Sequence, residues 1–260
     1  MNHGAQDISL FSLAIGFLAL LIPILILNYF KIKIIKDLAI SLLRMTLQLS
    51  LVGVYLEVIF KINNLWINLL WIIAMILVTA WTSVKRVKLN FKNYIFPVTL
   101  AILISLTLTN IFFIGTIIRP AYLFDARYLI PISGMILGNS LNHNIVGLST
   151  YLDAFRTKKE LYYFILTNSG NRQLAIQPFI KESIIRALNP LIAGMSVMGL
   201  ISLPGMMTGQ ILGGSSPATA IKYQIMIMIA IFTGCFFSLL LSIIFANKKL
   251  FDKYGNLSYY

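Results

Sequence analysis

Long apolar runs, separated by short polar segments, recur along the whole chain. About 20 helical residues are needed to cross a bilayer whose hydrocarbon core is about 30 Å thick, and several runs reach that length. Hydrophobic residues make up 58% of the sequence and charged residues only 11%, against about 25% charged residues in a typical soluble domain. The runs therefore predict an all-α integral membrane protein.

Seven segments are candidate transmembrane helices. They cover residues 8–30, 38–60, 65–84, 94–118, 129–150, 190–211 and 218–246. The fifth contains Asn139, Asn142, His143 and Asn144 and the sixth contains a Pro-Gly pair, so we expect both to lie inside the protein rather than against lipid. Since no repeat or low-complexity tract divides the chain, residues 1–260 are expected to form one membrane domain.

Lysine and arginine residues gather in alternate loops. Sixteen of the 21 follow the first, third, fifth and seventh candidate spans. Because cytoplasmic loops are enriched in these residues, the distribution predicts a multi-pass protein of the cell (inner) membrane, with its N-terminus outside and its C-terminus cytoplasmic. The net charge of +13 then reflects orientation and contact with anionic membrane lipid, and we expect no binding to nucleic acid.

Residues 203–214 interrupt the sixth span with the sequence Leu-Pro-Gly-Met-Met-Thr-Gly-Gln-Ile-Leu-Gly-Gly. Pro204 has no backbone N–H to donate and Gly205 loosens the chain, so we do not expect a regular helix to pass through this point. Backbone groups that are freed within a bilayer must find partners in protein or water. An interruption of this kind is typical of a transport path or a hinge.

The segment 151–189 is too polar to span a bilayer, yet its apolar residues recur at spacings of three and four. This spacing predicts two amphipathic helices, separated by a turn at Asn168–Asn171, with Pro178 bending the second helix. The apolar positions are Leu161, Phe164, Ile165, Ile176, Phe179, Ile180, Ile184 and Leu188. The pattern leaves open whether the helices lie at the lipid interface or dock a cytoplasmic partner.

Several stretches, spread in order over nearly the whole chain, carry a resemblance to known proteins. They are residues 44–49, 52–53, 80–81, 85–86, 130–135, 138–139, 199–209, 213–214, 217 and 222–226. The most distinctive is Leu-Pro-Gly-Met-Met at 203–207. Together they resemble the FetB-type iron-export permease family, which also includes plant aluminium-tolerance transporters. One departure is Asn-Ser-Gly at 168–170, where the family usually has Leu-Gly-Ala.

The resemblance implies the membrane-spanning permease subunit of an ABC-type exporter of iron or a related metal species, working as a homodimer. Its energy would come from a separate cytoplasmic ATPase that uses ATP, and the sequence has no Gly-x-x-x-x-Gly-Lys-Ser/Thr loop of its own. We therefore expect a transport subunit that is not an enzyme and binds no cofactor. The alternative is an ATP-independent secondary transporter or channel for a small cation. Such a carrier needs intramembrane carboxylates, for which Glu57 is the clear candidate.

Two short helices around a glycine turn, before a span that begins with proline, resemble the coupling loop of ABC permeases. In the exporter hypothesis the ATPase docks on residues 151–189 and buries the stretch from Arg156 to Glu182. The residues expected to take part are Arg156, Lys158, Lys159, Gly170, Arg172 and Glu182. Charge reversal at the two lysines and at Arg172 is expected to weaken the complex without unfolding the spans.

Polar and sulfur-containing side chains within the spans are candidates for a translocation path or gate. They are Arg44, Gln48, Glu57, Asn139, His143, Pro204, Gly205, Met206, Met207, Thr208 and Gln210. Several have a structural interpretation as well. Arg44, with Gln48 one turn away on the same helical face, is either an anchor or a gate. Glu57 either attracts a cation near an exit or pairs with Lys61.

Metal ligation is conceivable in two places. Asn139, Asn142 and His143 share a helical face, and imidazole suits iron, zinc or copper, yet polar residues also hold membrane helices together. Thioethers favour copper in its lower oxidation state, yet methionine also fills irregular packing. The methionines concerned are Met195, Met198, Met206, Met207, Met226 and Met228. The sequence alone assigns no firm metal site.

Overall fold

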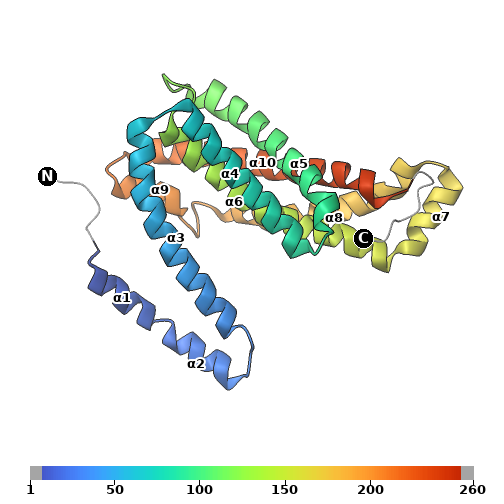
Figure 1. Ribbon diagram of the computed structural model, residues 1–260, viewed down its shortest axis with the longest axis horizontal. Coiled ribbons are helices and arrows are strands. Elements are labelled where there is room, and N and C mark those ends of the chain that lie inside the picture. The colour runs from blue at the N-terminus through green and yellow to red at the C-terminus, as the bar shows by residue number, and fades with distance from the viewer. Residues whose placement is uncertain (1–7, 253–260) are drawn as a thin grey trace. The chain divides into compact units, whose positions relative to one another are not determined.

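The computed structural model describes residues 8–252, and their secondary structure is almost wholly helical (Figure 1). The helices are α1 (Leu10–Leu18), α2 (Leu21–Tyr29), α3 (Ile35–Ile62), α4 (Leu65–Val87), α5 (Phe91–Phe112), the π-helix η1 (Phe113–Ile118), α6 (Ala126–Thr157), α7 (Lys159–Ser169), α8 (Arg172–Val197), α9 (Gly205–Leu212) and α10 (Pro217–Leu250). The predicted all-helical class is confirmed.

Five helical segments among residues 8–252 are long and apolar enough to cross a membrane. They are Phe11–Tyr29, Ile35–Ile62, Leu65–Val87, Phe91–Ile118 and Pro217–Leu250. These five correspond to the first, second, third, fourth and seventh predicted spans. The multi-pass membrane class is therefore supported, while the predicted count of seven is not confirmed.

The two remaining predicted spans have different boundaries from those expected. Helix α6 runs unbroken past residue 150 to Thr157, and α8 continues through Pro178 and Pro190 to Val197. Residues 198–204 are not helical, so the predicted interruption near Pro204 is confirmed and 190–211 is not one helix. The polar side chains of α6 and α8 lower their mean hydropathy, which is why neither qualifies as an apolar span.

Short polar side chains begin several of the helices. Asn64, Asp125, Asn171 and Ser216 each accept a hydrogen bond from a backbone N–H group in the first turn of the helix that follows. Those N–H groups have no partner inside the helix, so the caps stabilise the helix starts. Pro217 opens α10, where its missing N–H costs nothing.

The chain divides into two compact units, of which the first consists of residues up to Ile62 together with Gly209–Ser215. It contains α1, α2 and α3, and α2 packs against α3. In its two candidate spans, no residue of the most apolar window is buried. Most large side chains of this unit are therefore free to face lipid.

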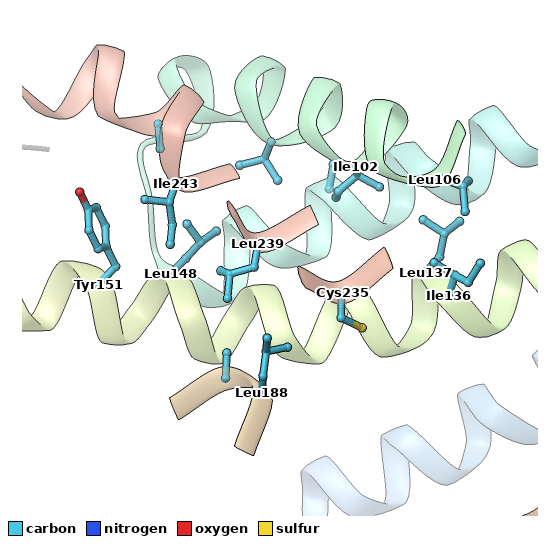
Figure 2. Packing of buried hydrophobic residues seen from close by; sticks show 14 of the residues in the cluster. Ile102, Leu106, Ile136, Leu137, Leu148, Tyr151, Leu188, Cys235, Leu239 and Ile243 are labelled. Atoms are coloured by element: carbon cyan, nitrogen blue, oxygen red, sulfur yellow. The ribbon is translucent and has the colours of Figure 1, made fainter. Parts of the chain in front are cut away.

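The second unit comprises Asn63–Thr208 and the chain from Ser216 onward. Helix α10 packs along α5 and α6, α4 lies against α6 and α5, and α8 lies against α6 (Figure 1). Figure 2 shows Leu239 and Ile243 of α10 directed toward Leu148 of α6, with Leu188 of α8 nearby. All four side chains are at most 3% exposed, so these helices share one continuous core.

Buried polar side chains also join the helices of the second unit. Ser105 Oγ on α5 donates to the carbonyl oxygen of Gly234 on α10 at 2.8 Å. Asn144 Nδ2 on α6 donates to Ser238 Oγ on α10, also at 2.8 Å. Hydrogen bonds of this kind hold helices together where no water competes for them. They explain how α6 tolerates several polar residues in its centre.

Candidate functional site

The interruption after α8 is a tight turn that satisfies part of its own backbone. Gly199 has a φ of +86°, a conformation that glycine adopts without strain, and its N–H donates to the carbonyl oxygen of Ser202 at 3.0 Å. At the start of α9, Thr208 Oγ1 donates to the carbonyl oxygen of Pro204 at 3.2 Å. The segment is therefore a defined structure between α8 and α9.

A pocket of about 460 Å³ lies beside this turn, between the end of α8, the start of α9 and α10. Four methionines line it: Met195, Met198, Met207 and Met228. Gln224 lines it too and is only 7% exposed. The Gln224 Nε2 lies 3.8 Å from Met198 Sδ, whereas its Oε1 is buried without a hydrogen-bond partner. We refer to this as the methionine pocket.

Only four of the six candidate methionines line the methionine pocket. Met206 and Met226 are not among the residues that line the methionine pocket, and both pack against the hydrophobic core. Gln224 lies in the stretch 222–226 that carries the family resemblance, but it was not among the predicted path residues. Its importance comes from burial and from the unpaired Oε1, which only the packing of α10 against the turn reveals.

Asn139 and His143 use their side chains within α6. Asn139 Nδ2 donates to the carbonyl oxygen of Met135 at 2.8 Å, and His143 Nδ1 hydrogen-bonds the carbonyl oxygen of Asn139 at 2.7 Å. Within residues 8–252, no group of three or more His, Cys, Asp or Glu side chains could hold a metal ion. The arrangement favours the structural interpretation of these two residues.

The predicted path residues of α3 lie on an exposed helix. Arg44 and Gln48 are both exposed. Glu57 Oε1 lies 2.7 Å from Lys61 Nζ, and the two side chains are 70% and 74% exposed. The pairing of Glu57 with Lys61 is thus confirmed. Gln210, on α9, accepts a hydrogen bond at its backbone carbonyl from the N–H of Ser215 at 2.9 Å.

Five aromatic side chains meet where α6, α7, α8 and the end of α10 come together. This aromatic cluster consists of Tyr151, Phe155, Tyr162, Phe179 and Phe251, and each is at most 6% exposed. Phe155 and Phe179 are stacked, with ring centroids 4.2 Å apart. The other three rings meet Phe155 edge-on at 5.0 to 5.4 Å. The cluster therefore fixes α7 to three other helical elements.

The turn predicted at 168–171 is shorter in the structure, because Asn168 and Ser169 belong to α7 and only residues 170–171 lie between the two helices. Gly170 ends α7 with a φ of +60°, and Asn171 caps α8. Burial raises the pKa of Tyr162 on α7, so its phenol stays neutral and contributes to packing. Tyr151 donates from its hydroxyl to Asn247 Oδ1 at 2.7 Å, which adds a polar tie between α6 and α10.

Charged side chains strengthen the same junction. Lys158 Nζ lies 2.6 Å from Glu182 Oε2, and the hydrogen bond from Lys158 lowers the pKa of the Glu182 carboxyl. Arg186 lies 3.8 Å from the other carboxylate oxygen. The Arg172 guanidinium lies 5.1 Å from the centroid of the Phe251 ring. Three predicted coupling residues, Lys158, Arg172 and Glu182, thus have partners within the chain.

Helix α7 turns part of its apolar surface outward. Tyr162 is buried and Ile165 and Leu166 are partly buried, whereas Leu161 is 43% exposed and Phe164 67% exposed. Of the stripe predicted for this helix, Leu161 and Phe164 are therefore exposed and Ile165 is partly buried. Tyr162, Ile165 and Leu166 have the same helical spacing, and the aromatic cluster selects that face because Tyr162 fits among its rings.

The remaining predicted coupling residues are exposed around α7. Arg156 Nη1 lies 3.6 Å from Asp153 Oδ1. Lys159 is exposed on α7, with Nζ 5.8 Å from the centroid of the Tyr163 ring. Both cations and Phe164 are exposed at this end of the second unit.

The stripe predicted for the second helix is confirmed. Its residues Ile176, Phe179, Ile180, Ile184 and Leu188 are all buried or partly buried. Ser183 lies among them, and its Oγ donates to the carbonyl oxygen of Gly147 on α6 at 2.7 Å. Sequence reasoning missed Ser183, because a serine within an apolar stripe carries no sign of its distant partner.

Comparison with known proteins assigns a family. The uncharacterised protein family UPF0014 matches residues 10–251. The chain belongs to this family. The UPF0014 membrane protein YjkA of Bacillus subtilis is 31% identical over 217 residues, which cover 84% of this chain and 85% of the relative.

Two further relatives have more specific names. The probable iron export permease protein FetB of Escherichia coli is 29% identical over 247 residues, covering 93% of this chain and 92% of the relative. Protein ALUMINUM SENSITIVE 3 of Arabidopsis thaliana is 32% identical over 189 residues, covering 72% and 67%. The resemblance drawn from the sequence is thus confirmed. No solved structure matches the chain significantly.

Proposed function

We propose that this chain is the membrane-spanning permease subunit of an ABC-type exporter, driven by a separate cytoplasmic ATPase. The observation that carries the proposal is similarity, over 93% of the chain, to a protein named a probable iron export permease. That name also supports iron or a related metal species as cargo and export as direction. Five candidate spans suit a transport subunit.

The surface around α7 is the proposed docking site for the ATPase. Phe164 and Leu161 are exposed on a short helix whose tip, 167–171, is polar. A surface that exposes an aromatic side chain and also Lys159 and Arg156 has the composition of a protein interface. We infer that a partner covers Phe164 while the charges lie at the rim.

The aromatic cluster suggests how such a partner would move the permease. Because Tyr162 on α7 packs with Phe155, Phe179 and Phe251, a displacement of α7 is passed to α6, α8 and α10 as one body. Helix α8 leads directly into the non-helical residues 198–204. This segment is the proposed hinge, since short irregular segments absorb the dihedral changes of such motions.

The membrane arrangement completes the proposal. Basic residues concentrate in alternate loops, which supports an inner-membrane protein with its N-terminus outside, its C-terminus in the cytoplasm and residues 151–189 on the cytoplasmic side. We further propose that residues 1–260 work as one permease domain and that two copies form the pathway. The permease itself would need no cofactor, since the partner hydrolyses ATP.

Purification from the native membrane tests the proposal. The tagged chain, extracted in mild detergent, is expected to copurify with a stoichiometric ATPase that mass spectrometry identifies by its phosphate-binding loop. Phe164→Ala and Lys159→Glu are expected to lose that partner while the melting temperature stays unchanged, because both side chains are exposed. Arg127→Glu is the matched control, since Arg127 is exposed at the opposite end of α6 and is expected to retain the partner.

Two results would contradict the proposal. If the chain purifies alone and moves metal into liposomes without ATP, the exporter proposal is replaced by the secondary carrier or channel. If the ATPase binds all three variants equally, the docking site lies elsewhere than on α7.

A further inference from the structure

The methionine pocket brings together four thioether side chains from three segments. Met195 and Met198 come from the end of α8 and the residue after it, Met207 from α9 and Met228 from α10. We propose that this pocket binds a soft monovalent metal ion of the copper(I) type. The proposal goes beyond the transport function, because it concerns binding by this chain alone and requires neither an ATPase nor a direction of transport.

Gln224 supplies the second observation that points to a ligand. It is nine-tenths buried and lines the same pocket. Its Nε2 faces Met198 Sδ at 3.8 Å, and a thioether is only a weak acceptor. Its Oε1 has no hydrogen-bond partner. Because buried acceptors are nearly always satisfied, the unpaired amide oxygen of a residue that lines the pocket points to a ligand there.

The donor set decides the class of ion. Thioether sulfur is a soft ligand that selects copper(I), whereas hard cations such as Mg²⁺ and Ca²⁺ require oxygen ligands. No ionisable side chain lines the pocket, so nothing there compensates a multiple charge. Burying a charge without compensation becomes costly, and a monovalent ion minimises that cost.

Packing alone does not account for the methionines. Methionine commonly fills irregular gaps, but here a volume of about 460 Å³ remains open beside four of them. The competing occupant is a small apolar molecule that donates one hydrogen bond to Gln224 Oε1. An apolar molecule would not be bound through the thioether sulfurs, so measurements of metal binding distinguish it from a metal ion.

Silver(I) is the probe for the first experiment, because it shares the soft, monovalent character of copper(I) and is not oxidised by air. The purified chain carries Cys235→Ala throughout, since this thiol is itself a soft ligand. Silver nitrate is titrated into the detergent-solubilised protein in chloride-free and thiol-free buffer, and binding is followed by calorimetry. We expect one saturable ion per chain.

Matched methionine variants locate the site. Met198→Leu and Met207→Leu are each expected to weaken silver binding at least tenfold, and the double variant is expected to abolish it. Leucine has nearly the same volume, so the fold is expected to tolerate these changes. Met206 on α9 and Met226 on α10 do not line the pocket, so the control variants Met206→Leu and Met226→Leu are expected to bind silver normally.

Two results would overturn the proposal. One is the absence of stoichiometric silver binding, with or without uptake of an apolar probe. The other is binding that survives in the double variant. Should the double variant not fold, X-ray absorption of the copper(I)-loaded protein with its methionines intact decides instead: sulfur neighbours support the site, and only nitrogen or oxygen neighbours refute it. None of these outcomes depends on whether an ATPase copurifies, so the two proposals fail separately.

Discussion

Helices α3 and α10 are both long and apolar enough to span a bilayer, yet they bury very different shares of their surfaces. In α3, of the first unit, no residue of the most apolar window is buried, whereas half of the corresponding window of α10 in the second unit is buried. Hydropathy alone therefore does not decide how much of a membrane helix is buried within its own unit. Helix α10 also carries small side chains along one face.

A stripe of small residues runs along α10 at every fourth position. It consists of Ala230, Gly234, Ser238, Ser242 and Ala246, all of which are buried. Small side chains let helix backbones approach closely, which matters in lipid because association there has little hydrophobic driving force. Along α3, leucine and valine occupy much of the exposed surface. Acyl chains can solvate such a helix without a protein partner.

The largest expected effect is a loss of stability on substitution in the aromatic cluster, compared with substitution in α3. Phe155→Ala removes the central ring of the cluster, and truncating a buried phenylalanine typically costs about 3–5 kcal/mol. Leu47→Ala in the exposed part of α3 is expected to change stability by less than about 0.5 kcal/mol. Denaturant unfolding of the detergent-solubilised proteins, followed by circular dichroism, measures both. Equal losses would show that α3 has a packing partner in solution.

A pair of glycine substitutions tests the small-residue stripe. A Cβ at Gly234 would lie 2.5 Å from Ile136 Cγ2, whereas one at Gly53 in α3 would meet nothing within 4 Å. Overpacking a tight contact costs about 1–3 kcal/mol, so Gly234→Leu is expected to be destabilised by that amount or more. Gly53→Leu should melt like the parent protein, or slightly higher because leucine favours helix. A lower stability of Gly53→Leu than of Gly234→Leu would contradict the role assigned to the small residues of α10.

The smallest expected effect concerns two ion pairs. A partly exposed pair contributes roughly 0.2–1 kcal/mol, and the pKa of Glu182 is lowered by its hydrogen bond from Lys158. The contribution of a carboxyl with a lowered pKa is complete above its unfolded pKa, about 4.3 for glutamate. It is lost as the pH falls through the folded value.

Melting temperatures as a function of pH measure this contribution. Glu182→Gln is expected to melt slightly below the parent at pH 7, with the gap closing at lower pH. The more exposed Glu57–Lys61 pair in α3 supplies the control, and Glu57→Gln is expected to show a smaller gap. A gap for Glu182→Gln that widens as the pH falls would contradict the assigned role of this carboxylate.

Local chemistry made part of the candidate site predictable. Pro204 lacks a backbone donor, so the interruption between α8 and α9 follows from the sequence. Gly170 can adopt a positive φ, so the turn before α8 also follows from the sequence. The inward face of α8, from Ile176 to Leu188, is readable because its apolar residues recur with the helical period. Each of these features depends on residues that are neighbours along the chain.

The buried face of α7 depends instead on contacts with residues that are distant in the sequence. Helix α7 carries two apolar faces of similar size, and only the rings of Phe155 and Phe179 select Tyr162 over Phe164. The choice leaves Phe164 exposed and so creates the proposed docking surface. Periodicity cannot distinguish the two faces, because both satisfy the same spacing.

The sequence by itself determined the membrane class, the main helices, the interruption near Pro204 and the family, because these depend on hydropathy, on local backbone chemistry and on residue identity. Only the tertiary structure decided which helices pack, which methionines share a pocket and that Gln224 Oε1 is left without a partner. Those outcomes arise from contacts between residues far apart in the chain, such as Met198 with Gln224. The physical reason is that close packing and the pairing of buried polar groups are properties of an assembled interior.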